Sequence, residues 1–317
     1  MNISINYSNT QNTALILPAP KLLAEVDWNN APVPAGMRKP TGLYNHSLNA
    51  LLTRLSPCTE FAPLESTDTI QNYLTSYDSL LDSIVEHIEA CESISEMLFQ
   101  MNDKKPGKGT RAFRKLSKPY TGHIKQIVNE IKHKQSSLNL TTLEAYETTV
   151  YGYFVDHCRD GKTICAHPDI HGGHSVAISF NRDLRWHLAG VFFVSDCLSQ
   201  LVSTMQGVDK VGISAGDIDK KQLLHSICKN IASLPQIVFP DEVLKDWITI
   251  KYFEEDENMS LKILCPCDSE HPSSFKRGRF SGRLISDGET RGIQMPYMGT
   301  DVQNYLSRIN PSGKHLF

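Results

Sequence analysis

Two short polar motifs combine residue types that can bind and cleave phosphodiester bonds. Arg182, Asp183 and His187 are spaced to share one side of the first turns of a predicted helix. An arginine and a helix N-terminus both favour a phosphate, and an imidazole can transfer a proton as general acid or base. Asn129 and His133 lie four residues apart on another predicted helix. Both motifs predict a phosphodiester site, although a polar helix face also carries histidine by chance.

The helix that carries Asn129 and His133 belongs to the most basic part of the chain. Residues 103 to 134 hold ten lysines and arginines and two acidic residues, a local charge of +8 where the whole chain has −3. A second run, residues 275 to 284, adds +4. Such runs attract phosphate-rich partners by Coulomb forces and counterion release. The predicted nucleic-acid contacts are Lys108, Arg111, Arg114, Lys115, Lys118, Lys125, Lys132, Lys276, Arg277 and Arg279.

The motif of Arg182, Asp183 and His187 resembles that of the HEPN family of helical ribonucleases and nucleotide-binding proteins. In that family an arginine, usually followed by Asn, Asp or His, precedes a histidine after a short gap. Asn129 and His133 resemble a second copy in which Val128 replaces the arginine. The resemblance spans about residues 66–205. It implies a metal-independent endoribonuclease of a defence or toxin-like system, in which the arginine and histidine pair across a homodimer.

The resemblance also implies individual roles and a substrate. Arg182 would stabilise the pentacoordinate phosphate, Asp183 would orient its neighbours, and His187 would help the ribose 2′-hydroxyl to attack. RNA is therefore expected rather than DNA, with no cofactor and no metal.

The same charges allow a non-catalytic interpretation. The basic surface would then dock nucleic acid, or an acidic protein partner in a larger assembly. A third reading is internal neutralisation, because the helix predicted before the basic one has an acidic face. That face consists of Asp78, Asp82, Glu86, Glu89, Glu92 and Glu96. The sequence leaves these alternatives open.

The elements that must position these residues predict an α+β fold. Residues 1–65 read as an extended, proline-rich arm with a short helix at 43–55. Residues 66–150 predict a long helical hairpin with a basic second helix, because apolar residues recur every three or four positions. Residues 151–317 predict a small antiparallel sheet with buried helices. This last region includes a hairpin at 150–168, a strand at 175–180, a helix at 182–205 capped by Asn181, a helix at 217–232 and strands at 247–253 and 261–266.

The remaining composition indicates a cytoplasmic protein that does not enter a membrane. The first residues lack the basic start and apolar core of a signal peptide. No window approaches the roughly 20 apolar residues that a membrane helix needs. The eight cysteines are therefore expected as thiols. A metal site stays open in one cluster, whose spacing fits no standard zinc pattern. It comprises His157, Cys158, Cys165, His167, Asp169, His171 and His174.

Overall fold

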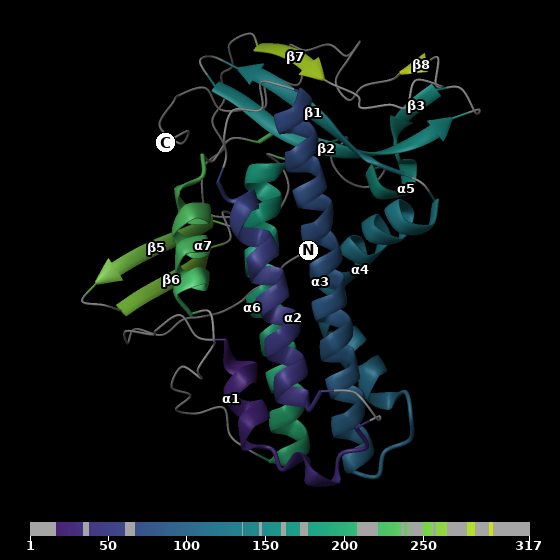
Figure 1. Ribbon diagram of the computed structural model, residues 1–317, viewed down its shortest axis with the longest axis vertical. Coiled ribbons are helices and arrows are strands. Elements are labelled where there is room, and N and C mark those ends of the chain that lie inside the picture. The colour runs from purple at the N-terminus through teal and green to yellow at the C-terminus, as the bar shows by residue number, and fades with distance from the viewer. Residues whose placement is uncertain are drawn as a thin grey trace.

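The computed structural model describes fourteen stretches of the chain, from residue 17 to residue 293. They are residues 17–33, 38–60, 67–134, 136–145, 148–159, 163–171, 177–207, 221–235, 238–239, 242, 249–255, 258–264, 278–282 and 292–293. The order of elements in them confirms an α+β fold. Helices run along the long axis of the molecule, and a sheet lies across one end of them (Figure 1).

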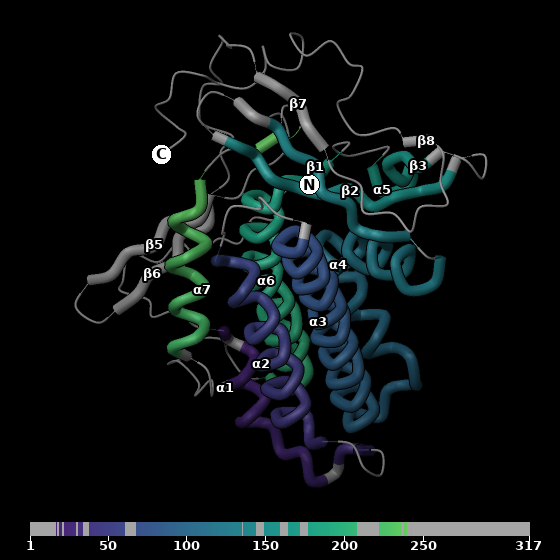
Figure 2. Tube along the Cα trace, turned by 45° about the horizontal axis from the view of Figure 1, so that its top comes forward, coloured from purple at the N-terminus to yellow at the C-terminus, as the bar shows by residue number. Residues whose placement is uncertain are grey.

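Four long helices form the body of the molecule. They are α2 (Pro40–Cys58), α3 (Thr67–Met101), α4 (Lys108–Lys134) and α6 (Phe180–Gln206). Helix α3 packs against α2, α4 and α6, and α4 also packs against α6. Figure 2 shows the same helices side by side after rotation. The predicted helical hairpin is confirmed as α3 and α4, because the apolar stripes of both helices face the shared core.

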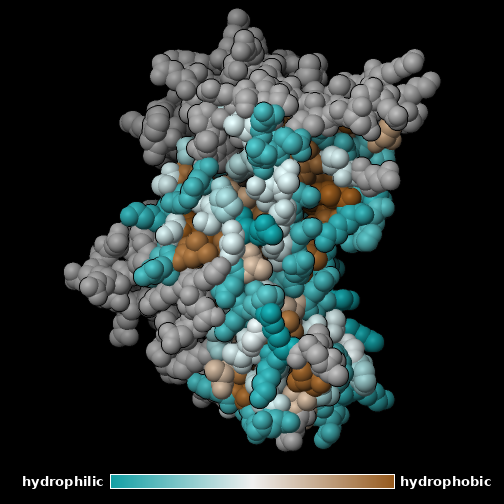
Figure 3. Space-filling view, in the orientation of Figure 1, coloured by the Kyte–Doolittle hydropathy of each residue, from teal (hydrophilic) through white to brown (hydrophobic). Residues whose placement is uncertain are grey.

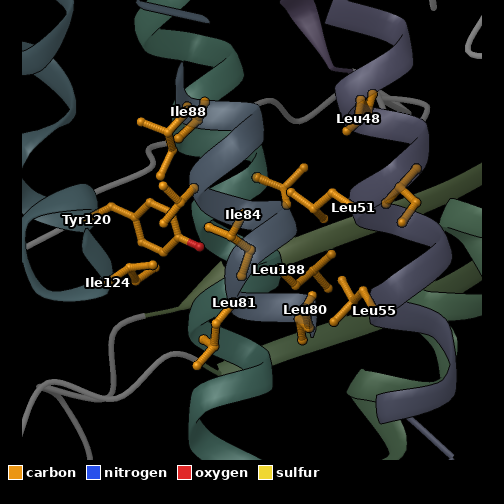
Figure 4. Packing of buried hydrophobic residues seen from close by; sticks show 14 of the residues in the cluster. Leu48, Leu51, Leu55, Leu80, Leu81, Ile84, Ile88, Tyr120, Ile124 and Leu188 are labelled. Atoms are coloured by element: carbon orange, nitrogen blue, oxygen red, sulfur yellow. The ribbon is translucent and has the colours of Figure 1, made fainter. Parts of the chain in front are cut away.

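The core between these helices consists of aliphatic side chains and a few aromatic rings. Leu51 of α2, Ile84 of α3 and Leu188 of α6 are fully or almost fully buried. Tyr120 of α4 points its hydroxyl toward the same cluster (Figure 4). One hydrophobic cluster thus joins side chains from all three segments predicted from the sequence.

The N-terminal part differs from the extended arm that was predicted. Helix α1 (Pro18–Glu25) forms there and packs against α6, followed by the 3-10 helix η1 (Trp28–Asn30). Pro18 stands in the first turn of α1, where its missing N–H removes no hydrogen bond. Helix α2 also begins with a proline in its first turn and continues through Pro57, beyond the predicted end of the helix. In both α1 and α2 a proline stands in the first turn of the helix, a role of proline that the prediction did not consider.

The main sheet has the order β7-β1-β2-β3-β8, and β4 pairs with β2. Its strands are β1 (Leu138–Ala145), β2 (Thr148–Arg159), β3 (Thr163–Ala166), β4 (Ile178–Ser179), β7 (Gly278–Gly282) and β8 (Gly292–Ile293). The predicted hairpin is confirmed as β2 and β3, which pair antiparallel. Strand β8 pairs parallel with β3, so the sheet is antiparallel apart from that pair. The prediction missed β1, which pairs with β2 over its whole length.

The remaining elements are shorter or lie apart from the sheet. They are α5 (Pro168–His171), α7 (Lys221–Ser233), β5 (Thr249–Glu255) and β6 (Asn258–Leu264), the last two forming a separate antiparallel hairpin. The predicted third strand is reduced to the two residues of β4. The predicted cap at Asn181 is wrong, because α6 begins at Phe180, two residues earlier than predicted, and Ser179 occupies the cap position without a side-chain bond.

Helix α6 has the length and composition of a membrane span, with a mean hydropathy of 1.4 over its most apolar window. The sequence did not lead us to expect such a segment. Within the protein 67% of that window is buried, and α1, α3, α4 and α7 all pack against the helix. Such burial and packing on several sides are typical of a helix in the core of a folded protein.

Candidate functional site

The predicted site residues lie in two places, on the surface of α4 and inside the bundle at the start of α6. The position of α4 is fixed by a close contact with α3. A Cβ atom on Gly109 would lie 2.2 Å from the carbonyl oxygen of Ser95, so the two helices approach here as only glycine allows. The basic helix is therefore held against its acidic neighbour from its first turn.

Glu96 of α3 caps the start of α4. Its carboxylate accepts hydrogen bonds from the backbone N–H of Gly107 at 2.6 Å and of Thr110 at 3.0 Å. Partial burial raises the pKa of Glu96, but these N–H donors outweigh it and hold the pKa below its usual value. An anion favoured by the helix N-terminus is thus already supplied by the protein.

Four cations of α4 are neutralised by acidic side chains. Glu92 is buried and receives two of them, one on each carboxylate oxygen. The pairs are Arg114–Glu92 at 2.8 Å, Lys125–Glu92 at 2.6 Å, Lys132–Asp82 at 3.0 Å and Lys134–Glu130 at 2.7 Å. Internal neutralisation, one of the three interpretations of the charge, therefore applies to this part of the helix.

Six other cations remain exposed, and we call them the cationic row. They are Lys104, Lys105, Lys108, Arg111, Lys115 and Lys118. None of them forms an ion pair with a residue that the structure describes. The four on α4 follow one another by three or four positions and so share one face of the helix. The row is the part of the basic stretch whose charge is available to a partner.

The start of α6 contributes a polar group to the interior instead of the surface. Oδ2 of Asp183 accepts hydrogen bonds from the hydroxyls of Tyr77 and Tyr153, both at 2.7 Å. Nε2 of His187 lies 3.2 Å from the same oxygen, and Nδ1 of His187 lies 3.3 Å from the hydroxyl of Tyr120. All five side chains are buried, and we call them the Asp183 cluster.

The Asp183 cluster favours a charged carboxylate. Burial alone raises the pKa of Asp183, but the charge of His187 and the hydrogen bonds from Tyr77 and Tyr153 outweigh it, so the pKa lies well below its usual value. Nε2 of His187 lies close to the carboxylate of Asp183 without meeting hydrogen-bond geometry. The cluster joins α3, α4, β2 and α6 through polar contacts.

Arg182 does not join Asp183 and His187, although the sequence allowed all three to converge. Its guanidinium lies 3.5 Å from the carboxylate of Glu242, a fully buried residue, and its side chain is 23% exposed. The same Glu242 oxygen accepts the backbone N–H of Ser179 at 3.0 Å, and its other oxygen accepts that of Phe239 at 2.9 Å. Arg182 thus helps to compensate a buried carboxylate, whose pKa burial raises.

The second motif is accessible but separate. Asn129 and His133 are both exposed on α4, whereas Val128, in the place of the family arginine, is buried. Lys125, which extends their face, is bound to Glu92. The catalytic roles of Arg182, Asp183, His187, Asn129 and His133 stay predictions from the sequence.

Three predicted nucleic-acid contacts belong to the second basic run, toward the C-terminus. Lys276 and Arg277 lie outside the described residues. Arg279 falls in β7, whose backbone pairs with β1.

The histidine and cysteine cluster does not assemble in the part of the chain that the structure describes. His157 pairs with Cys165 across the hairpin, so Cys158 points to the opposite face from Cys165. Nε2 of His171 accepts the backbone N–H of Val155 at 3.0 Å. Within the described residues no three His, Cys, Asp or Glu side chains are placed to share a metal ion. His174 lies outside those residues.

A further buried group, around His87, combines residue types known from nucleophilic catalysis. Nδ1 of His87 lies 2.8 Å from the hydroxyl of Ser47, and Nε2 lies 3.9 Å from the thiol of Cys91. Burial lowers the pKa of His87 to about 4 and raises the pKa of the Cys91 thiol, so neither is activated. This group is a hydrogen-bonded part of the core.

Sequence reasoning missed the partners that decide these environments. In the sequence, Tyr77 and Tyr120 fall on the apolar stripes of the two helices of the predicted hairpin. A buried tyrosine hydroxyl usually requires a hydrogen-bond partner, so two tyrosines on core faces were a signal that an acceptor lay between the helices. Glu242 carried no comparable signal, because it lies far from Arg182 in the sequence and in no periodic element.

A scan against protein-family models, a search of curated proteins and a search of solved structures each found no match to the chain.

Proposed function

We propose that this protein binds nucleic acid without cleaving it, through the cationic row at the start of α4. The observation that supports the proposal most directly is the row itself: six exposed cations that no described acidic residue neutralises. Free cations that release counterions from phosphates supply most of non-specific nucleic-acid affinity. RNA is the ligand to test first, because the resemblance to HEPN proteins implies it.

Catalysis is not part of the proposal because of where the histidine lies. A general acid or base must come within hydrogen-bond reach of the substrate. The side chain of His187 is only 2% exposed, and both ring nitrogens face protein atoms. The guanidinium of Arg182 lies beside the carboxylate of Glu242, whereas the nuclease interpretation requires it beside a phosphate. This burial speaks against cleavage by the first motif.

Binding to a labelled RNA, followed by fluorescence anisotropy at low salt, tests the proposal. The variant Arg111→Gln with Lys115→Gln removes two charges from the row, and Lys132→Gln with Lys134→Gln removes two paired charges from the same helix. We expect the first variant to weaken binding by about tenfold or more and the second to weaken it much less.

Two outcomes of this RNA-binding measurement would overturn the proposal. One is equal weakening by both variants, which would show a response to net charge alone. The other is absence of RNA binding together with row-dependent binding of poly-glutamate, which would assign the row to an acidic protein partner. Incubation of the parent with RNA in EDTA completes the test, since specific cleavage that His187→Ala abolishes would restore the nuclease interpretation.

A further inference from the structure

Among the described residues, α4 exposes no phenylalanine, tyrosine or tryptophan ring beside its four cations of the cationic row. Proteins that hold single-stranded nucleic acid stack its bases on exposed aromatic rings. The two aromatic residues of α4, Phe113 and Tyr120, are 0% and 1% exposed. Both rings belong to the hydrophobic core, and Figure 4 shows the ring of Tyr120 beside Ile84 and Ile88 of α3. The helix that carries the row therefore offers charge without exposed rings of its own on which bases could stack.

The row is also straight and firmly supported. Its four helical members run from Lys108 to Lys118, about 15 Å at the rise of an α-helix. The helix beneath them is fixed by the Gly109 contact and by the cap from Glu96. A straight row of cations on a rigid helix matches an equally regular row of phosphates, and 15 Å covers about four steps of one strand in a double helix.

A single strand would gain less from the same contacts. Its backbone must be ordered on binding, and stacking normally offsets that entropy. The buried rings of Phe113 and Tyr120 cannot supply that stacking from α4. Figure 3 shows a mostly hydrophilic surface on the drawn face, with separate apolar patches among the hydrophilic side chains.

We infer that the cationic row grips the phosphate backbone of a double helix and does not read its bases. This inference rests on the proposed function and narrows its ligand from nucleic acid in general to a duplex. Because the contacts go to phosphates, binding is independent of sequence. RNA and DNA duplexes present the same chemistry to the row.

Anisotropy with a labelled RNA duplex, the same strand unpaired, a duplex of scrambled sequence and a DNA duplex tests the inference. We expect both RNA duplexes to bind alike and more tightly than the single strand. Four contacts give a slope of log K against log salt of about −3.6 and six give about −5.4, so affinity falls about 10²- to 10³-fold from about 50 to about 200 mM salt. Arg111→Gln with Lys115→Gln reduces the slope by about 1.8, whereas Lys132→Gln with Lys134→Gln leaves it unchanged.

The outcomes separate this inference from the function on which it rests. Equal or tighter binding of the single strand, with the row still required, overturns the duplex and leaves nucleic-acid binding intact. A strong dependence on sequence, or a strict requirement for ribose, overturns contact with phosphates alone. Failure of every nucleic acid to bind overturns both proposals.

Discussion

The Asp183 cluster and the cationic row differ in what their polar side chains face. In the Asp183 cluster each charge or hydroxyl is turned inward and has a protein partner within 3.3 Å. In the cationic row the charges are exposed and meet no described acidic residue. Both lie on the same bundle. The sequence predicted Asp183 and His187 for RNA cleavage, and it predicted four cations of the row for nucleic-acid binding, which are Lys108, Arg111, Lys115 and Lys118.

The difference teaches that burial decides which polar motif can meet a ligand. A buried carboxylate must have its hydrogen bonds satisfied by the protein, so its partners are chosen for stability. An exposed lysine costs nothing to leave unpaired, because water solvates it. The more motif-like group consequently faces protein partners, whereas the less specific one faces solvent.

Removing Asp183 should produce the largest effect, because it breaks the buried member of the comparison. Asp183→Ala leaves the hydroxyls of Tyr77 and Tyr153 without their acceptor inside the core. We expect a loss of about 3–5 kcal/mol in the free energy of unfolding, measured with urea. Arg111→Gln, in the row, should change it by less than about 0.5 kcal/mol.

A small loss for Asp183→Ala, under about 1 kcal/mol, would contradict a structural role for the cluster. Asp183→Asn serves as the conservative variant, since an amide oxygen can still accept from one tyrosine. Its free energy of unfolding should fall between those of the parent and the alanine variant.

Gly190 leaves the space that the ring of Tyr120 occupies in the Asp183 cluster. Its replacement should have the next largest effect on the free energy of unfolding. A Cβ atom there would lie 2.0 Å from Cζ of Tyr120, whose hydroxyl faces His187. We expect Gly190→Ala to destabilise by about 1–3 kcal/mol through overpacking of a ring that is fully enclosed. Gly122 on α4 is exposed with nothing within 4 Å of an added Cβ, so Gly122→Ala should stabilise by about 0.8–1 kcal/mol. Thermal unfolding of both variants would show whether the gain in helix propensity or the close contact with Tyr120 determines the change in stability at position 190.

Acid should weaken the folded bundle in two steps, first through His87 and then through the Asp183 cluster. The pKa of His87 is about 4 in the folded protein and about 6.5 when unfolded, so the unfolded state takes up its proton first and stability falls from about pH 6.5 to 4. The pKa of Asp183 is depressed by folding, so its contribution is complete above about pH 3.9 and is lost as pH falls further. Urea unfolding across this range, parent minus Asp183→Asn, isolates the second step. A difference independent of pH below 4 would contradict the ionised cluster.

Much of this fold was predictable because it follows from periodicity. The apolar stripes of α3 and α4 repeat every three or four residues over many turns, and the loop between them contains glycine and proline. Strand β1 was missed because its sequence, Leu138–Ala145, is half polar and gains its order from pairing with β2 and β7. Helix α1 was missed because prolines were weighed as breakers and not as first-turn residues.

The site was less predictable, because the partners of a side chain depend on tertiary contacts. The spacing from Asp183 to His187 was correct for one helix face, and the structure brings them together at 3.2 Å. Spacing could not tell that this face turns inward, since Tyr77 and Tyr153 approach from other elements. It likewise could not separate the cations of α4 that form ion pairs from those that do not, a distinction made by Glu92 and Asp82 on α3 and by Glu130 on α4.

Replacing Glu92 should produce the smallest effect of the variants considered. Its carboxylate neutralises Arg114 and Lys125, so these two cations do not belong to the cationic row. Burial raises its pKa, but the hydrogen bonds and charges of Arg114 and Lys125 outweigh burial and lower it. Glu92→Gln removes the charge that neutralises them, and Arg114 is already 61% exposed. We expect tighter duplex binding by a few fold, with the salt slope steeper by up to about 1.8, as two cations become free for phosphates.

Glu86→Gln is the matched control, because this exposed residue of the same helix loses the same charge but forms no ion pair with a described residue. If both variants tighten binding equally, net charge governs affinity and the distinction between paired and free cations fails; if only Glu92→Gln does, pairing within the hairpin sets the size of the binding surface.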